Sequence, residues 1–176
     1  MRKFICFFFL GFFILGICTA QEQENTWNGT VRFDIADNFL NLHNAVPGMS
    51  VTWTHFINAR LGIPLQIDTH FGRGLLPGFQ ISFLSGAEFI PISPAYKDKS
   101  GLLLNVKAGI SLLIYEGVRP AFITKANVGY QFISTRGFVF TPAAGIIYNV
   151  HSGLGFNLLL DLGFAYRREL FRGLFN

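Results

Sequence analysis

The feature that most limits the fold is an alternation of apolar and polar residues with a period of two, repeated along the chain. It is clearest in residues 102–115, where one face carries Leu102, Leu104, Val106, Ala108, Ile110, Leu112 and Ile114. The opposite face carries Asn105, Lys107, Gly109 and Ser111. Successive side chains point to opposite faces in a strand, whereas a helix repeats every 3.6 residues. The pattern therefore predicts β-strands.

Eight such runs are separated by turn signals such as Pro47-Gly48, Arg136-Gly137 and Ser152-Gly153. They span roughly 28–36, 48–58, 61–71, 77–90, 101–115, 118–133, 137–151 and 153–168. The sequence thus predicts an all-β domain of eight antiparallel strands. The alternation fails near Ser85-Gly86, and Pro142 falls in the middle of a run, so we expect a β-bulge at each place.

The N-terminus has the three-part layout of a secretory signal. Arg2 and Lys3 precede an apolar run at 4–18, and Cys18-Thr19-Ala20 places small residues before a cleavage site. We expect cleavage after residue 20 and a single domain at 21–176. One alternative is a retained anchor, although the run is shorter than the ~20 apolar residues that span a bilayer. Another is a lipoprotein signal that uses Cys18.

Removal of residues 1–20 changes the composition of the remaining chain. Both cysteines, Cys6 and Cys18, leave with the signal, so a disulfide and a cysteine metal site are not expected. Without Arg2 and Lys3, the fourteen Lys and Arg residues fall to twelve, against ten Asp and Glu. This near balance predicts no binding of nucleic acid.

The apolar faces of the runs can point to lipid or into a soluble core. No segment after Ala20 approaches eighteen consecutive apolar residues, so spanning helices are not expected and a closed barrel is the remaining membrane architecture. The apolar faces of the last four runs carry no charge, and the polar faces carry single charges among Gly, Ser, Asn and Gln. Aromatic residues recur near the run ends, as in interfacial girdles: Trp53, Phe71, Phe79, Phe122, Phe132, Phe138 and Tyr166. These observations favour lipid.

In signal, size and strand pattern the chain resembles the small eight-stranded bacterial outer-membrane proteins of the OmpA, OmpX and OmpW type. The resemblance implies a transmembrane up-and-down antiparallel β-barrel in the bacterial outer membrane. Its implied partners are outer-membrane lipid and the barrel-assembly machinery, which reads a final strand that closes with an aromatic residue. The segments Asp161–Tyr166 and Leu174-Phe175-Asn176 are similar to that signal. Likeness to OmpW implies a narrow, porin-like conduit for small hydrophobic solutes.

The polar faces predict a network inside the barrel. Its candidate residues are Asp68, Lys107, Lys125, Asn127 and Asp161, with Arg32 and Glu88 as further members. Eight strands leave an interior just wide enough for side chains to fill, and buried charges there must pair. Pairing would close the lumen, so a diffusive pore is not expected.

A rim site is the sharper but weaker hypothesis. Asp68 and His70 share one face of one strand, and His70 and His151 both fall near the expected outer rim. A lipid-modifying enzyme could use such a histidine as an acid or base, but a polar lumen or rim residue is the more ordinary reading. Residues 38–46 are apolar for an external loop and could line a side entrance or pack on the rim.

The sequence therefore predicts a non-enzymatic outer-membrane barrel with no cofactor and no bound metal. Its role is structural or surface-interacting, or that of a narrow conduit for small hydrophobic molecules. The alternatives are a secreted soluble lipocalin-like barrel that binds a hydrophobic ligand and, less favoured, the lipid-modifying enzyme.

Overall fold

The computed structural model describes residues 27–35, 48–58, 60–72, 78–91, 100–114, 117–150 and 153–167. These residues form eight strands: β1 (Gly29–Asp34), β2 (Gly48–Phe56), β3 (Leu61–Gly72), β4 (Gly78–Phe89), β5 (Gly101–Ile114), β6 (Val118–Ile133), β7 (Phe138–Asn149) and β8 (Gly153–Tyr166). The predicted signal peptide at 1–20, the apolar segment 38–46, His151 and Leu174–Asn176 lie outside the described residues.

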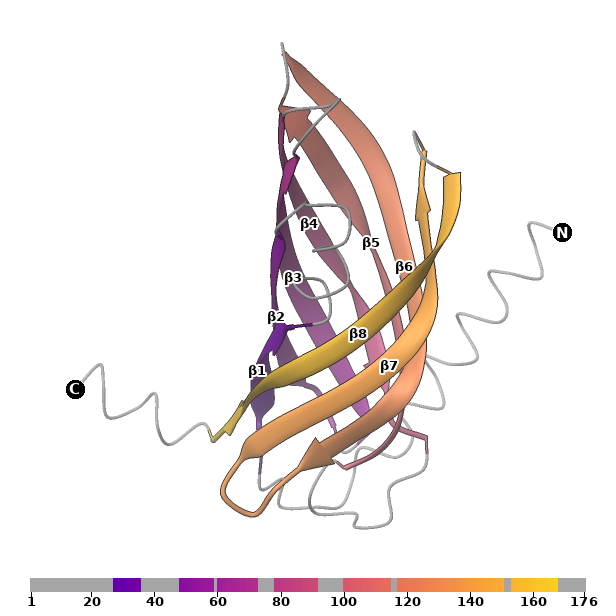
Figure 1. Cartoon of the computed structure of the whole chain (residues 1–176). Helices are drawn as coiled ribbons and strands as arrows, with labels where there is room; N and C mark the ends of the chain where they lie inside the picture. Colours follow the sequence, from indigo (N-terminus) through magenta and orange to yellow (C-terminus); the bar gives the residue numbers. More distant parts are fainter. Residues whose placement is uncertain are drawn as a thin grey trace, which may run out of the picture.

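The strands form one closed antiparallel barrel (Figure 1). Each strand pairs with its neighbour in the sequence, and β1 pairs with β8 to close the ring. The eight-stranded all-β prediction is confirmed, and each predicted run corresponds to one strand whose bounds differ from it by at most two residues. The barrel has a shear number of about ten. When the register is followed from Gly29 through the paired residues of all eight strands, it returns to β1 displaced by about ten residues. Such a stagger gives the strong strand tilt that is typical of small barrels.

The two ends of the barrel are named here by the connections that they carry. We call the end with the β6–β7 turn the lower end and the end with the β5–β6 connection the upper end, as drawn in Figure 1. In the β6–β7 turn, the Gly137 N–H donates to the Ser134 carbonyl at 2.9 Å, and Gly137 adopts a φ of 84°. Glycine takes this left-handed conformation without the steric penalty of a side chain. The β5–β6 hairpin rises furthest at the upper end.

The bulge predicted near Ser85-Gly86 is wrong. The register of β4 is constant along both β3 and β5, and the β3–β4 pairing skips only Ile63 and Pro64. Proline has no N–H to give to the ladder. At this gap the Ser85 hydroxyl donates to the Pro64 carbonyl at 3.0 Å. The polar residue that broke the alternation therefore satisfies a backbone acceptor on the outer face, without any extra residue in the strand.

The bulge predicted at Pro142 is wrong for a similar reason. Pro142 pairs with Leu160 in an unbroken β7–β8 ladder. On its other side, the β6–β7 ladder omits Thr141 and Pro142 and resumes at Phe140 in the same register. A closed barrel can therefore accept a proline by losing a short stretch of pairing with one neighbour.

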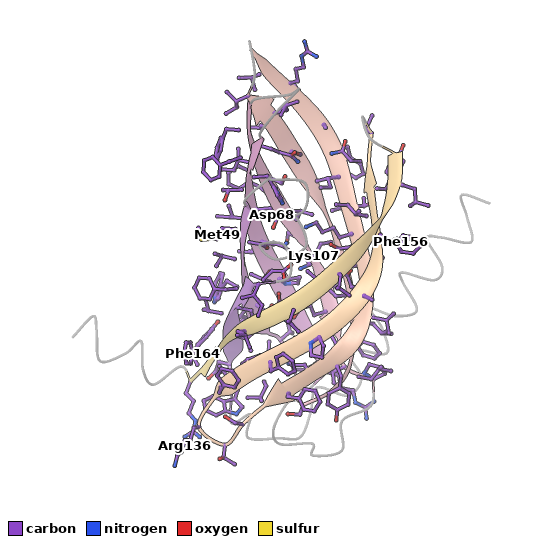
Figure 2. All side chains as sticks on the ribbon, viewed as in Figure 1. Met49, Asp68, Lys107, Arg136, Phe156 and Phe164 are labelled. Atoms are coloured by element: carbon purple, nitrogen blue, oxygen red, sulfur yellow. The ribbon has the colours of Figure 1, made fainter. Side chains whose placement is uncertain are left out.

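The two faces of the strands have opposite chemistry. The buried positions of the strands are mostly polar or charged, including Arg32, Gln66, Asp68, Glu88, Asn105, Lys107, Lys125, Gln131 and Asp161. The exposed positions carry large apolar side chains, among them Phe33, Ile67, Phe83, Ile110, Val128, Ile146, Phe156 and Phe164. In Figure 2, Asp68 and Lys107 lie inside the outline of the barrel, whereas Met49, Phe156 and Phe164 project away from it. This distribution is the reverse of that in a soluble globular protein.

An apolar cluster of Trp27, Ile133 and Val139, with Ala165 packed against it, occupies the inside of the barrel at its lower end. We call it the apolar floor. Among the described residues no helix is long and apolar enough to cross a membrane.

Candidate functional site: a charged network inside the barrel

The first group of buried polar residues centres on Arg32 of β1, and we call it the arginine cluster. The Arg32 guanidinium forms an ion pair and hydrogen bond with Glu88 of β4. It also donates to Thr54 at 2.9 Å and to Gln131 at 3.2 Å, and its Nε lies 3.8 Å from the Asp161 carboxylate. Residues from four other strands thus converge on one guanidinium.

Glu88 is held from several sides as well. Thr54 Oγ1 donates to Glu88 Oε2 at 2.9 Å, and Asn105 Nδ2 donates to Glu88 Oε1 at 2.6 Å. Arg32 and Glu88 are each only 1% exposed. A buried ion pair of this kind is stable only when further hydrogen bonds satisfy its partners. Here both Glu88 oxygens and both terminal guanidinium nitrogens of Arg32 are bonded, whereas the buried Arg32 Nε has no hydrogen-bond partner.

The second group surrounds Asp68 of β3, and we call it the lysine cluster. Lys125 Nζ donates to Asp68 Oδ2 at 2.7 Å. Ser50 Oγ and Gln66 Nε2 donate to Asp68 Oδ1 at 2.6 Å and 2.5 Å. Lys107 Nζ donates to the side-chain carbonyl of Gln66. Both carboxylate oxygens of Asp68 are therefore engaged.

Lys107 and Lys125 lie directly opposite each other in the β5–β6 pairing. Like charges at such a position are destabilising. Here the two ammonium groups bond to different residues of β3, Lys107 to Gln66 and Lys125 to Asp68. Asp68 supplies a counter-charge to Lys125, and Gln66 supplies a neutral acceptor to Lys107.

The interior also holds uncharged polar side chains that bond to one another. Gln80 Nε2 and Ser82 Oγ both donate to Ser111 Oγ, at 2.8 Å and 3.0 Å. Asn157 Nδ2 donates to Asn127 Oδ1 at 2.7 Å. The two clusters and these neutral contacts therefore all place hydrogen-bonded polar side chains inside the barrel.

The structure places all five residues of the predicted network among the buried side chains: Asp68, Lys107, Lys125, Asn127 and Asp161. Lys107, Lys125 and Asp68 meet in the lysine cluster, Asp161 lies beside Arg32 in the arginine cluster, and Asn127 contacts Asn157. Sequence reasoning did not include the neutral members Ser50, Thr54, Gln66, Asn105 and Gln131 in the network. The signal that could have found them is that each occupies the same face as the charges.

The structure describes only one of the two rim histidines. His70 lies on β3, on the same face as Asp68, and His151 lies outside the described residues. Asp68 is already held by Ser50, Gln66 and Lys125. Among the described residues no group of three or more His, Cys, Asp or Glu side chains could hold a metal ion.

No known protein family, curated protein or solved structure matches the chain.

Proposed function

We propose that the protein is an integral β-barrel of the bacterial outer membrane with a sealed lumen, and that its role is structural or surface-interacting rather than that of a pore. The observation that carries this proposal is the charge distribution of the wall. In the eight described strands every charged side chain is buried except Arg119, near the upper end of β6. The outer positions carry large apolar side chains.

A lipid environment accounts for this wall better than water does. Soluble proteins rarely expose contiguous apolar patches of more than a few hundred Å². A soluble lipocalin-like barrel would place its apolar side chains inside to hold a hydrophobic ligand, whereas the interior here holds ion pairs and amides. The strands β2 to β8 each have nine to sixteen residues, which is long enough to cross a bilayer.

Aromatic contacts at both ends of the strands support the same proposal. Phe71 and Phe79 contact each other at the upper end, with ring centroids 5.1 Å apart. At the lower end Phe132 contacts Phe140, and Phe138 contacts Phe164. Rings of aromatic residues at both interfaces are typical of transmembrane barrels.

The sealed lumen follows from the two clusters and the apolar floor. The interior is filled by charged side chains that form ion pairs and hydrogen bonds: Arg32, Glu88, Lys107, Lys125 and Asp68. An eight-stranded barrel has little space beyond what such side chains occupy. A small hydrophobic solute would have to displace these charges, so a conduit through the lumen is the weaker proposal.

Membrane insertion is tested by heat modifiability. The purified protein is folded in detergent micelles, and boiled and unboiled samples are compared on a denaturing gel together with circular dichroism. We expect different migration of the unboiled sample, a β-rich spectrum and no folding in plain buffer. A folded species in buffer without detergent would overturn the membrane proposal in favour of a soluble secreted barrel.

The sealed lumen is tested by conductance in planar bilayers. The unmodified protein should be silent. A variant in which Arg32, Glu88, Asp68, Lys125 and Trp27 are all replaced by alanine should conduct, because it truncates both clusters and the apolar floor. Val106→Ala on the outer face of β5 is the matched control and should stay silent. Steady conductance by the unmodified protein would support the conduit instead.

A further inference from the structure

The lower end of the barrel carries charged residues outside the strands. Among the described residues that belong to no strand, the charged ones are Arg60, Arg136 and Arg167. All three are basic and all three lie at the lower end, in turns or directly after β8. The lower rim of the described barrel is therefore positively charged.

Arg136 and Arg167 lie on neighbouring elements of this rim. Arg136 is in the β6–β7 turn, which is joined to β8 by a hydrogen bond from the Ala165 N–H to the Gly137 carbonyl at 2.6 Å. Arg167 directly follows β8, and its guanidinium carbon lies 4.7 Å from the ring centre of Trp27. The stacking on Trp27 holds the Arg167 guanidinium at the rim, and Figure 2 shows Arg136 beyond the ring of Phe164 at the lower end.

The outer face just above these arginines is aromatic and carries polar groups. Phe138 and Phe164 pack edge to face with ring centroids 6.4 Å apart. Beside them, Trp53 Nε1 donates to the Tyr166 hydroxyl at 2.9 Å. Tryptophan and tyrosine with a polar tip are enriched where hydrocarbon meets the headgroups of a bilayer. The arginines therefore stand at the level that headgroup phosphates would occupy.

We propose that Arg136 and Arg167 bind the headgroup phosphate of an anionic phospholipid, whose acyl chains lie against Phe138 and Phe164. Guanidinium groups pair with phosphate through two parallel hydrogen bonds, and both side chains are exposed. The charge of the rim complements an anionic headgroup, and the acyl-chain surface continues the apolar outer face. This inference rests on the proposed membrane location and adds a selectivity for lipid charge at one end.

The test uses Trp53 as a reporter. The chain has two tryptophans, so Trp27→Phe leaves Trp53 as the reporter and keeps an aromatic ring for the Arg167 guanidinium to stack on. Trp53 is 43% exposed and donates a hydrogen bond to Tyr166, the residue before Arg167. The variant is reconstituted in phosphatidylcholine vesicles in which either phosphatidylcholine or phosphatidylglycerol is brominated, and quenching of Trp53 is measured. We expect roughly fivefold preferential quenching by the anionic lipid, the attraction typical of one surface arginine. High salt should reduce it.

Matched variants assign the effect to this site. Arg136→Gln/Arg167→Gln in the same background should abolish the preference, whereas Arg119→Gln at the other end of the barrel should preserve it. Equal quenching by the two brominated lipids would overturn the lipid site and leave the membrane proposal intact. Absence of quenching by either lipid would overturn the membrane proposal itself. Loss of the preference on adding soluble glycerol phosphate would indicate a site for free anions and would also overturn the inference.

Discussion

The outer and inner faces of the same eight strands place opposite demands on a side chain. Ile67 on the outer face is 46% exposed, while its neighbours Gln66 and Asp68 are buried among bonded polar groups. An outer side chain needs only to be apolar, because its contacts with lipid acyl chains are not specific. An inner side chain needs a specific partner from another strand, because an unpaired buried charge is costly. The comparison teaches that the outer face tolerates exchange among apolar residues, whereas the inner face depends on pairs.

The largest effect should come from removing one member of an inner pair. Glu88→Ala leaves Arg32 buried with only the more distant Asp161 as a counter-charge. Breaking a buried pair in this way costs about 3–5 kcal/mol of unfolding free energy. Urea unfolding in lipid vesicles, followed by tryptophan fluorescence, measures the loss.

The double variant Arg32→Met/Glu88→Leu is its control. Replacement of both charges by apolar side chains of similar volume should restore part of the lost stability, because the Arg32 charge is then no longer buried without Glu88. The recovery should be incomplete, because Asp161 loses Arg32 as its ion-pair partner. A double variant as unstable as Glu88→Ala would show that the damage comes from lost packing. It would contradict the view that the inner face depends on pairs.

The cost in stability of a charge on the outer face should depend on its depth in the bilayer. Ile67→Lys, in the middle of β3, should cost about 2–4 kcal/mol in vesicles, whereas Ile57→Lys, next to the β2–β3 turn, should cost about 0–1 kcal/mol. Unfolding titrations of the two variants in the same lipid provide the measurement. Equal costs at the two positions would contradict burial of this face in a bilayer.

The smallest effect should come from a polar residue on the apolar side. Ser85→Ala removes the hydroxyl that bonds the Pro64 carbonyl, and we expect a loss of about 0.5–1.5 kcal/mol. In a Pro64→Ala background the loss should shrink, because the backbone can then complete the ladder. A loss that is the same in both backgrounds would mean that Ser85 does not compensate for the proline.

The sequence predicted the strands well because their signal is local. Alternation over 102–115 and 118–133 needs no knowledge of neighbouring strands, and β5 and β6 lie within a residue of those bounds. The two bulges were predicted wrongly, because a local break in pattern does not reveal how a neighbouring strand responds. Only the structure shows that the Ser85 hydroxyl reaches the Pro64 carbonyl.

The composition of the network was partly predictable, but its pairing was not. Alternation places Lys107, Lys125 and Asp68 on the inner face, yet their partners depend on the register between strands far apart in the sequence. Arg32 meets Glu88 across 56 residues and Gln131 across 99. No pattern within one segment carries that information.

The pairing of β1 with β8, which we call the closing seam, joins the two ends of the sheet and must form after both strands are in place. Every contact between paired strands is between sequence neighbours except the one between β1 and β8, and β1 has only six residues. Folding from one hairpin to the next therefore involves short loop closures, whereas joining Gly29–Asp34 to 161–166 must close nearly the whole chain. Until that step the growing sheet has two unpaired edges, which can join another chain. The seam is thus both the slowest contact to form and the one that ends the risk of aggregation.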